Sequence, residues 1–282
     1  MRRSLPFAVL LLAATACSGP EPLPTITGQT AETGTPPDPT AATGDTGPVF
    51  EFDVEKESFA AFRADKGVTL GSNDEVTAWT DVSGTLTATL DPPGTDGIKI
   101  FVDGGLPGLD FNGTSNLVAE LGQRLSDATI FVRFRYDATQ SDNDYLYTVG
   151  DGLIDTAGGT QMSLSRGTFD GQGTLESYHY TGKDELLGER IRSDRWITST
   201  QIYRGTKQKD GGSHHTLFLD GDDAKMDLAD TAYDVQGSLA IGNYLSGDFR
   251  LANAEIRRFV IFDRILTDDE ITATEAWMAA GN

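Results

Sequence analysis

Three carboxylates stand two residues apart in the segment EFDVE, at Glu51, Asp53 and Glu55. Alternate residues of a β-strand point to one face, so in a strand these side chains would share a surface. Two carboxyl groups at a suitable separation can hydrolyse a glycosidic bond. In a regular strand, however, Glu51 and Glu55 would lie about 13 Å apart at Cα, whereas a retaining pair needs roughly 5 to 5.5 Å between its carboxyl groups. Phe52 and Val54 supply a buried face, and we therefore interpret EFDVE as a strand whose carboxylates point to water.

Groups for nucleophilic catalysis are scarce. The histidines are His179, His214 and His215, and no Gly-x-Ser-x-Gly segment accompanies them. His214 and His215 would face opposite ways on a strand and could not easily share a metal ion, so we interpret His215 as structural. We therefore expect that the protein is not an enzyme. A hydrolase acting on polysaccharide is the alternative, and it would need a second carboxylate in reach and a cleft.

Oxygen-rich turns make calcium the candidate cofactor, because calcium prefers six to eight oxygen ligands. Three places are rich in oxygen atoms: the turn that contains Asp220, Asp222 and Asp223, the turn at 141–144, and the pair Asp103 and Asp110. None of these segments has the spacing of an EF-hand, and Asp is also an ordinary turn residue. The predicted metal ligands are Asp220, Asp222 and Asp223.

Carbohydrate binding would need exposed aromatic faces beside carboxylates and amides. Two clusters fit this description: Tyr145 and Tyr147 beside Asp142, Asn143 and Asp144, and Tyr178 and Tyr180 around His179. Half-buried tyrosines are also common in any β-sandwich, where the ring packs and the hydroxyl stays wet, so packing is the competing interpretation. We expect Trp79 and Trp196 to be packed.

The elements that would position these residues are short strands. The segments 129–136 (TIFVRFRY) and 256–262 (IRRFVIF) alternate apolar and polar residues, as strands with one buried face do. The pair Asp220-Gly221 between apolar runs predicts a hairpin. One helix is expected, from Thr267 to Ala280, with Thr267 and Glu270 as a capping box. The pattern predicts an all-β sandwich with a short C-terminal helix.

The first 49 residues have a different character. Arg2 and Arg3 precede an apolar run and small residues ending at Cys17, which is the layout of a secretory signal. The segment Ala14-Thr15-Ala16-Cys17 resembles a bacterial lipobox, which implies that residues 1–17 are a lipoprotein signal peptide and that Cys17 carries the lipid. Residues 18–49 are rich in Pro, Thr and Gly and are expected to form a disordered tether. Residues 50–282 would form the folded domain.

Composition excludes several partners. The chain has 43 acidic and 22 basic residues and a formal net charge of −21, so nucleic acid and anionic membrane surfaces are poor partners. Contact with a membrane would come through the lipid anchor only. With one cysteine, the folded part can contain no internal disulfide.

Three segments, in order, resemble laminin-G-like (concanavalin A-like) domains. In the segment 59–84 the matching residues are Ala64, Asp65, Gly67, Val68, Val76, Trp79, Asp81, Ser83 and Gly84. The segments LPGLDFNGTSNLV (106–118) and AEIRRFVIFDRILTDDEI (254–271) match the next two landmarks. The resemblance implies a jelly-roll sandwich of two antiparallel sheets, in a superfamily whose members are often glycan-binding or adhesive.

EFDVE also resembles the Glu-x-Asp-x-Glu active-site strand of retaining β-glucanases and laminarinases, but over five residues only. Those enzymes carry the motif in the middle of the chain rather than directly after a tether.

Together these observations predict an exported, lipid-anchored protein of the outer membrane or cell surface. Its expected role is non-catalytic binding or adhesion, with a glycan or a neighbouring surface protein as partner. A glycoside hydrolase of the same fold and a structural envelope protein with a protein partner are the alternatives.

Overall fold

The computed structural model describes residues 50–91, 97–136, 144–150, 161–169, 172–179, 184–190, 195–205, 215–226, 235–243 and 251–281. The predicted signal peptide, Cys17 and the tether lie outside these residues. Within the described part, no helix combines the length and the apolar character needed to cross a membrane.

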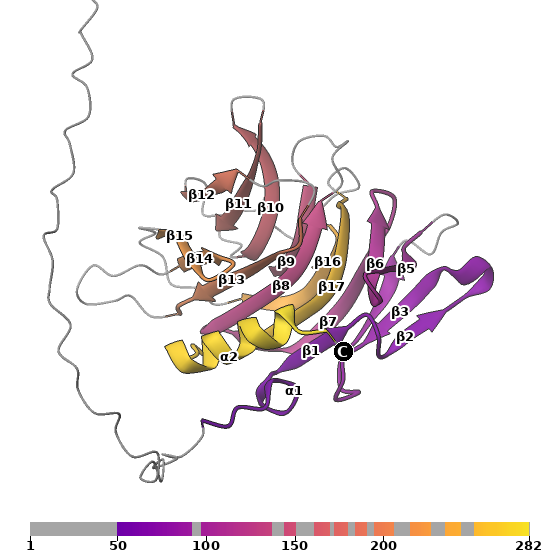
Figure 1. The fold of residues 1–282 in the computed structure, drawn as a ribbon, viewed down its shortest axis with the longest axis horizontal. Helices are drawn as coiled ribbons and strands as arrows, with labels where there is room; N and C mark the ends of the chain where they lie inside the picture. Colours follow the sequence, from indigo (N-terminus) through magenta and orange to yellow (C-terminus); the bar gives the residue numbers. More distant parts are fainter. Residues whose placement is uncertain are drawn as a thin grey trace, which may run out of the picture. The chain divides into compact units, whose positions relative to one another are not determined.

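The described strands form two sheets (Figure 1), and every pairing between two of these strands is antiparallel. The first sheet has the order β15 (Asp222–Met226), β14 (His215–Leu219), β13 (Ile197–Tyr203), β8 (Ala128–Tyr136), β17 (Asn253–Phe262), β6 (Leu106–Asn112) and β5 (Lys99–Asp103), with β1 (Ala60–Arg63) beside β17. The second sheet has the order β12 (Asp184–Arg190), β11 (Gln172–His179), β10 (Gln161–Phe169), β9 (Asp144–Gly150), β16 (Val235–Ile241), β7 (Asn116–Leu125), β4 (Thr87–Asp91), β3 (Val76–Thr80) and β2 (Val68–Leu70). The predicted β-sandwich is confirmed.

The main core lies between the two sheets, because alternate residues of each strand point inward. Ile130, Val132 and Phe134 of β8 are fully buried and pack in one cluster with residues of the second sheet such as Leu117 and Val149. The side of the first sheet that faces away from the second sheet is called its outer face below.

Several of the residues that carry the resemblance in the segment 59–84 make contacts that hold this part of the fold together. Trp79 is fully buried, as expected, and its indole N–H donates to the Arg63 carbonyl oxygen at 2.9 Å. Asp81 is buried and accepts hydrogen bonds from the Leu86 and Ser83 backbone N–H groups, which closes the turn between β3 and β4. Gly67 has φ +70°, and the Thr80 carbonyl oxygen occupies the place of a Cβ. The motif therefore has a structural role in this chain.

The prediction of a strand over EFDVE is wrong. Asp53 instead caps α1 (Val54–Glu57), accepting a hydrogen bond from the Lys56 backbone N–H. Val54 is buried, as the alternation suggested, but the carboxylates do not line a strand face. Glu55 forms ion pairs with Arg63 and Lys66, which ties α1 to β1.

The C-terminal helix α2 (Asp268–Ala279) is confirmed together with its capping box. It lies over one half of the outer face of the first sheet (Figure 1), where Met278 and Leu266 pack against Phe131 and Val260 in a second apolar cluster. The other half of the outer face, beyond the C-terminal end of α2, carries charged and aromatic side chains.

The hairpin predicted at Asp220-Gly221 is also confirmed, between β14 and β15. Both residues have positive φ, 51° and 83°, as the tight two-residue turn of a hairpin requires.

Candidate functional site

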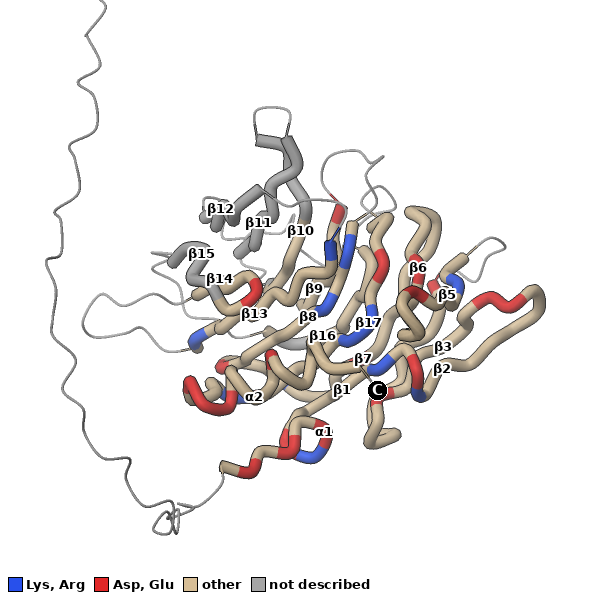
Figure 2. Tube along the Cα trace, in the orientation of Figure 1, with Lys and Arg blue, Asp and Glu red and all other residues tan. Residues whose placement is uncertain are grey.

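An irregularity in β17 creates the candidate site. The pairing of β17 with β8 shifts between Ile256 and Arg258, because Ile256 faces Phe134 and Arg258 faces Arg133. Arg257 is therefore an extra residue, a β-bulge. The bulge places two consecutive arginines next to the two that β8 contributes by alternation, Arg133 and Arg135, and Figure 2 shows these basic positions on β8 and β17.

Trp196, directly before β13, lies on this part of the outer face. The Arg257 guanidinium carbon is 3.9 Å from the centre of the indole, and that of Arg135 is 5.0 Å away. The indole N–H donates to the Asp103 carboxylate at 3.0 Å. The ring of Phe101 lies nearly parallel to the indole, at an interplanar angle of 5° and a centroid distance of 6.1 Å.

The position of the Phe101 ring depends on a glycine, Gly108, in the neighbouring strand β6. Phe101 pairs with Gly108, and a Cβ at Gly108 would collide with the Phe101 ring. The ring therefore lies directly on the backbone of β6. Trp196 and Phe101 together form the aromatic pair of the site.

Two carboxylates flank the aromatic pair and share one guanidinium. Glu255 faces Arg135 across β17 and β8, and its carboxylate accepts a short hydrogen bond from Arg135 Nε. Arg135 Nη1 lies 3.2 Å from the Asp103 carboxylate, to which Arg257 also donates at 3.3 Å. Asp103 is 42% exposed and Glu255 is 26% exposed, so solvent reaches both carboxylates.

The charges of the site stabilise one another. The hydrogen bond from Trp196 and the charges of Arg135 and Arg257 lower the pKa of Asp103. The hydrogen bond to Glu255 raises the pKa of Arg135. The site therefore presents the Asp103 carboxylate, favoured in its ionised form, and charged guanidinium donors beside two aromatic rings. Such a set can bind the hydroxyl groups and the apolar face of a sugar ring.

The predicted cluster around Tyr145 is only partly described, since Asp142 and Asn143 lie outside the described residues. Tyr145 is 2% exposed and Tyr147 is fully buried. The Tyr147 hydroxyl donates to Gln201 in the interior. The expectation of exposed aromatic faces at these two positions is wrong, because both side chains belong to the interior. Asp144 is buried as well.

The second predicted cluster gives less information. Tyr178 lies in β11, opposite Ser163 of β10 and Glu185 of β12. Its side chain and the whole of Tyr180 lie outside the described part of the chain, so ligand binding there stays a prediction.

The metal prediction is also untested as a whole, because the side chains of Asp222 and Asp223 are not described. Asp220 is described, and its carboxylate accepts from Arg195 at 2.8 Å, from the Thr198 backbone N–H at 2.8 Å and from Arg133 at 3.4 Å. Two guanidiniums make this carboxylate a poor place for a cation. Among the described residues no three His, Cys, Asp or Glu side chains are grouped to hold a metal ion.

His215 is fully enclosed and its ring stacks on Tyr203 at a centroid distance of 4.3 Å, in agreement with a structural role.

The expectation that Trp196 is packed agrees with its half-buried ring, but the sequence reasoning did not identify Trp196 or the arginines as residues of the site. Two signals were available. The alternation over 129–136 places Arg133 and Arg135 on one face, and the adjacent pair Arg257-Arg258 interrupts the alternation of the next apolar strand, which is how a bulge looks in a sequence. No local pattern in the sequence could predict where the indole lies, because Asp103, which accepts its hydrogen bond, is 93 residues away from Trp196.

No protein-family model and no curated protein matches the chain. Among solved structures, domain 4 of an extracellular GH43 arabinanase from Geobacillus stearothermophilus, in complex with arabinotriose, is similar at a TM-score of 0.52 and 16% identity, over 77% of this chain and 97% of that one. The binding domain of Paraclostridial Mosquitocidal Protein 1 is similar at a TM-score of 0.53 and 15% identity, over 80% of this chain and 53% of that one. Trypanosoma rangeli sialidase in complex with sialic acid is similar at a TM-score of 0.51 and 14% identity, over 76% of this chain and 32% of that one.

The last two similarities cover about half and about a third of the proteins concerned. At these identities the likeness establishes the fold. It also corrects one expectation from the sequence, that the protein is not an enzyme. This expectation is wrong, because about a third of a sialidase and one domain of an arabinanase have the fold of this chain.

Proposed function

We propose that the protein binds a carbohydrate on the open half of the outer face of the first sheet. The observation that carries the proposal is the indole of Trp196, held on a solvent-accessible sheet face by Asp103 and Arg257. Arg257 and Phe101 cover part of this ring, and the half-buried indole offers its remaining apolar surface at little cost in conformational entropy. Asp103, Glu255 and Arg135 supply hydrogen-bonding partners for hydroxyl groups around it.

The solved structures support the same class of ligand. One similar domain was seen with arabinotriose and one similar enzyme with sialic acid. A role in carbohydrate recognition is therefore consistent with both the fold and the composition of the site.

The test is a glycan-array screen followed by calorimetry, comparing the protein with its Trp196→Ala and Phe50→Ala variants. We expect Trp196→Ala to weaken binding of any hit by about ten-fold or more, the loss typical of a central aromatic contact. Phe50 is the matched control, since it is an exposed aromatic residue that stacks on Phe52 and lies outside the site. Equal affinity of Trp196→Ala and the unchanged protein would exclude this site.

Hydrolysis of a polysaccharide is the second candidate function. It is favoured by Asp103 and Glu255, whose carboxylates contact the same guanidinium, and it requires that one of them leave Arg135 and gain a proton when substrate binds, because a glycosidase needs a general acid. Release of reducing sugar from array hits, abolished by Glu255→Gln, would support catalysis. Bound sugar that is recovered intact after prolonged incubation would argue for binding alone.

We also propose, from the sequence, that Cys17 carries a lipid and that residues 18–49 tether the domain to the outer membrane or cell surface. The expected result is that Cys17→Ser moves the protein from the membrane fraction to the soluble fraction. Incorporation of a labelled fatty acid into the unchanged protein, but not into the variant, would identify the anchor directly.

A further inference from the structure

The two carboxylates of the proposed sugar site are each held through one oxygen. At Asp103, the Trp196 indole N–H and the guanidiniums of Arg135 and Arg257 all lie against Oδ2, at 3.0, 3.2 and 3.3 Å. At Glu255, Arg135 Nε donates to Oε2. From the described part of the chain, no hydrogen bond reaches Asp103 Oδ1 or Glu255 Oε1. Each solvent-accessible carboxylate therefore keeps one open oxygen.

The two open oxygens require hydrogen-bond donors from a ligand. An ionised carboxylate oxygen accepts hydrogen bonds and cannot donate them. The hydrogen bond from Trp196 and the charges of Arg135 and Arg257 lower the pKa of Asp103, which favours its ionised form. A group that binds at Asp103 Oδ1 therefore has to carry an O–H or N–H.

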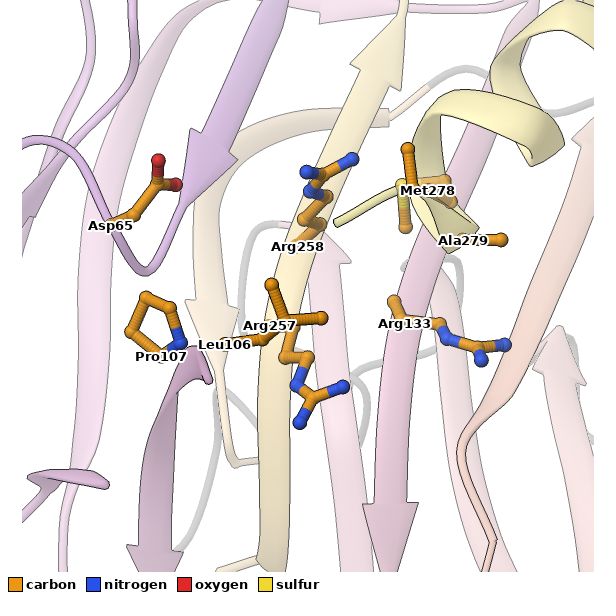
Figure 3. Close-up of a pocket in the computed structure, with 9 residues that line it drawn as sticks. Asp65, Leu106, Pro107, Arg133, Arg257, Arg258, Met278 and Ala279 are labelled. Carbon is orange, nitrogen blue, oxygen red and sulfur yellow. The ribbon is translucent and has the colours of Figure 1, made fainter. Parts of the chain in front are cut away.

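The arginines near the site do not form a place for an acidic group. Arg257 Nη2 donates to the Asp103 carbonyl oxygen at 2.7 Å as well as to the carboxylate. Figure 3 shows that the guanidiniums of Arg133, Arg257 and Arg258 point away from one another. The cavity that they line encloses about 20 Å³, which is room for about one water molecule. These three arginines therefore offer no converging set of donors to an anion.

The charges of the site favour a neutral donor over a charged one. The guanidiniums of Arg135 and Arg257 balance the carboxylates of Asp103 and Glu255, and both guanidiniums would repel an ammonium group at the open oxygens. A ligand carboxylate would be repelled by the open oxygens themselves and by the net charge of −21. A hydroxyl group avoids both kinds of repulsion.

We propose that Asp103 Oδ1 and Glu255 Oε1 select a neutral sugar, whose hydroxyl groups donate to them while its ring lies on the open part of the Trp196 indole. The Arg135 guanidinium bridges the two carboxylates, so one oligosaccharide can contact both. This inference rests on the proposed function. It specifies the ligand as a neutral glycan and makes Asp103 and Glu255 the residues that determine specificity.

The test is a glycan array that carries neutral gluco-, galacto- and manno-oligosaccharides and, beside each, the same oligosaccharide oxidised at C6 to uronic acids. Oxidation adds carboxylates and leaves the linkage and the ring size unchanged. We expect the hits to be neutral forms. Each oxidised partner should bind about ten-fold or more weakly, because its carboxylates are repelled by the open oxygens. Calorimetry of the matched pair measures the ratio of the two affinities.

Two variants assign the preference to the open oxygens. Asp103→Asn keeps one oxygen for the indole N–H and places an amide NH2, a donor, at the open position. We expect it to weaken binding of the neutral form about ten-fold and to bring the affinities of the two forms within about two-fold of each other. Glu255→Gln makes the same change at the other carboxylate and should reduce the preference in the same direction.

Asp91→Asn is the matched control, because Asp91 is an exposed carboxylate at the end of β4 in the second sheet and its loss changes the net charge equally. The preference of this variant should equal that of the unchanged protein.

The outcomes separate this inference from the proposed function. Hits that are mainly oxidised sugars, equal binding of the two forms, or a neutral preference that survives both Asp103→Asn and Glu255→Gln would overturn the selection and leave sugar binding standing. Failure of every sugar to bind a folded protein overturns both.

Discussion

At the scale of single residues, Gly67, directly before β2, and Gly84, between β3 and β4, show two different constraints on a glycine. Gly67 and Gly84 both have positive φ, 70° and 78°. Only Gly67 also meets another backbone segment, at the Thr80 carbonyl oxygen, whereas a Cβ at Gly84 would have no atom within 4 Å. The pair is therefore a natural comparison of backbone strain alone with strain plus collision.

We expect Gly84→Ala to lower the free energy of unfolding by about 1 kcal/mol, from strain in the left-handed region. Gly67→Ala should cost clearly more, about 3 kcal/mol or above, because the strand pairing at Thr80 must also shift. Urea unfolding of both variants measures the difference. Equal costs would show that the contact with Thr80 is not maintained in solution.

At the scale of elements, α2 depends on its first turn. Arg264 donates two hydrogen bonds to Glu270, at 2.9 and 2.8 Å, and the Thr267 backbone N–H donates to the same carboxylate at 2.8 Å. The hydrogen bonds from Arg264, followed by those from Thr267, lower the pKa of Glu270 from 4.5 to about 2.

A lowered pKa means that the folded state favours the ionised carboxylate. The stabilisation is therefore fully present above pH 4.5 and is lost as the pH falls toward 2. We expect Glu270→Gln to be less stable than the unchanged protein at pH 7, with a difference that narrows between pH 4.5 and 2. Unfolding curves across this range test it, and a difference that did not change with pH would contradict the assignment.

The β-bulge at Arg257 in β17 is the second feature to test at the scale of elements. Because Ile256 and Arg258 pair with the consecutive residues Phe134 and Arg133, deletion of Arg257 would leave a regular ladder. We expect the deletion variant to keep its β-sheet circular dichroism, since each flanking residue keeps its face. It should lose sugar binding, because Trp196 loses the guanidinium 3.9 Å from its ring. Unfolding of the deletion variant would mean that the bulge also supports the sheet.

At the scale of the whole molecule, charge opposes folding. The formal net charge is −21, and self-repulsion of like charges destabilises a compact state. We expect the melting temperature at neutral pH to rise between 20 and 500 mM NaCl, about where the Debye length becomes shorter than the spacing of surface charges. Differential scanning calorimetry checks this. A falling melting temperature would indicate that the surface ion pairs, such as Arg63 with Glu55, outweigh the repulsion.

Local sequence determined the elements whose signals lie within a few residues. The capping box at Thr267 and Glu270, the Asp220-Gly221 turn and the alternation of β8 were all predictable, because caps, turns and strand faces depend on neighbours in the chain. EFDVE was misjudged because the capping bond of Asp53 competes with a strand pattern that five residues cannot distinguish.

The candidate site was decided by the tertiary structure. Alternation assigns a residue to one face of its strand, but it does not say which strands become neighbours or which half of a face a helix covers. In the strand order β8, β17 and β6 lie between β13 and β5, so only the folded structure shows that Trp196, directly before β13, reaches Asp103 of β5, while α2 packs over the other half of the sheet. Tyr145 and Tyr147, which we predicted as ligands, are buried, and Trp196, which we expected to be packed, is half-buried beside the charged site, because burial depends on what the rest of the chain places above each face.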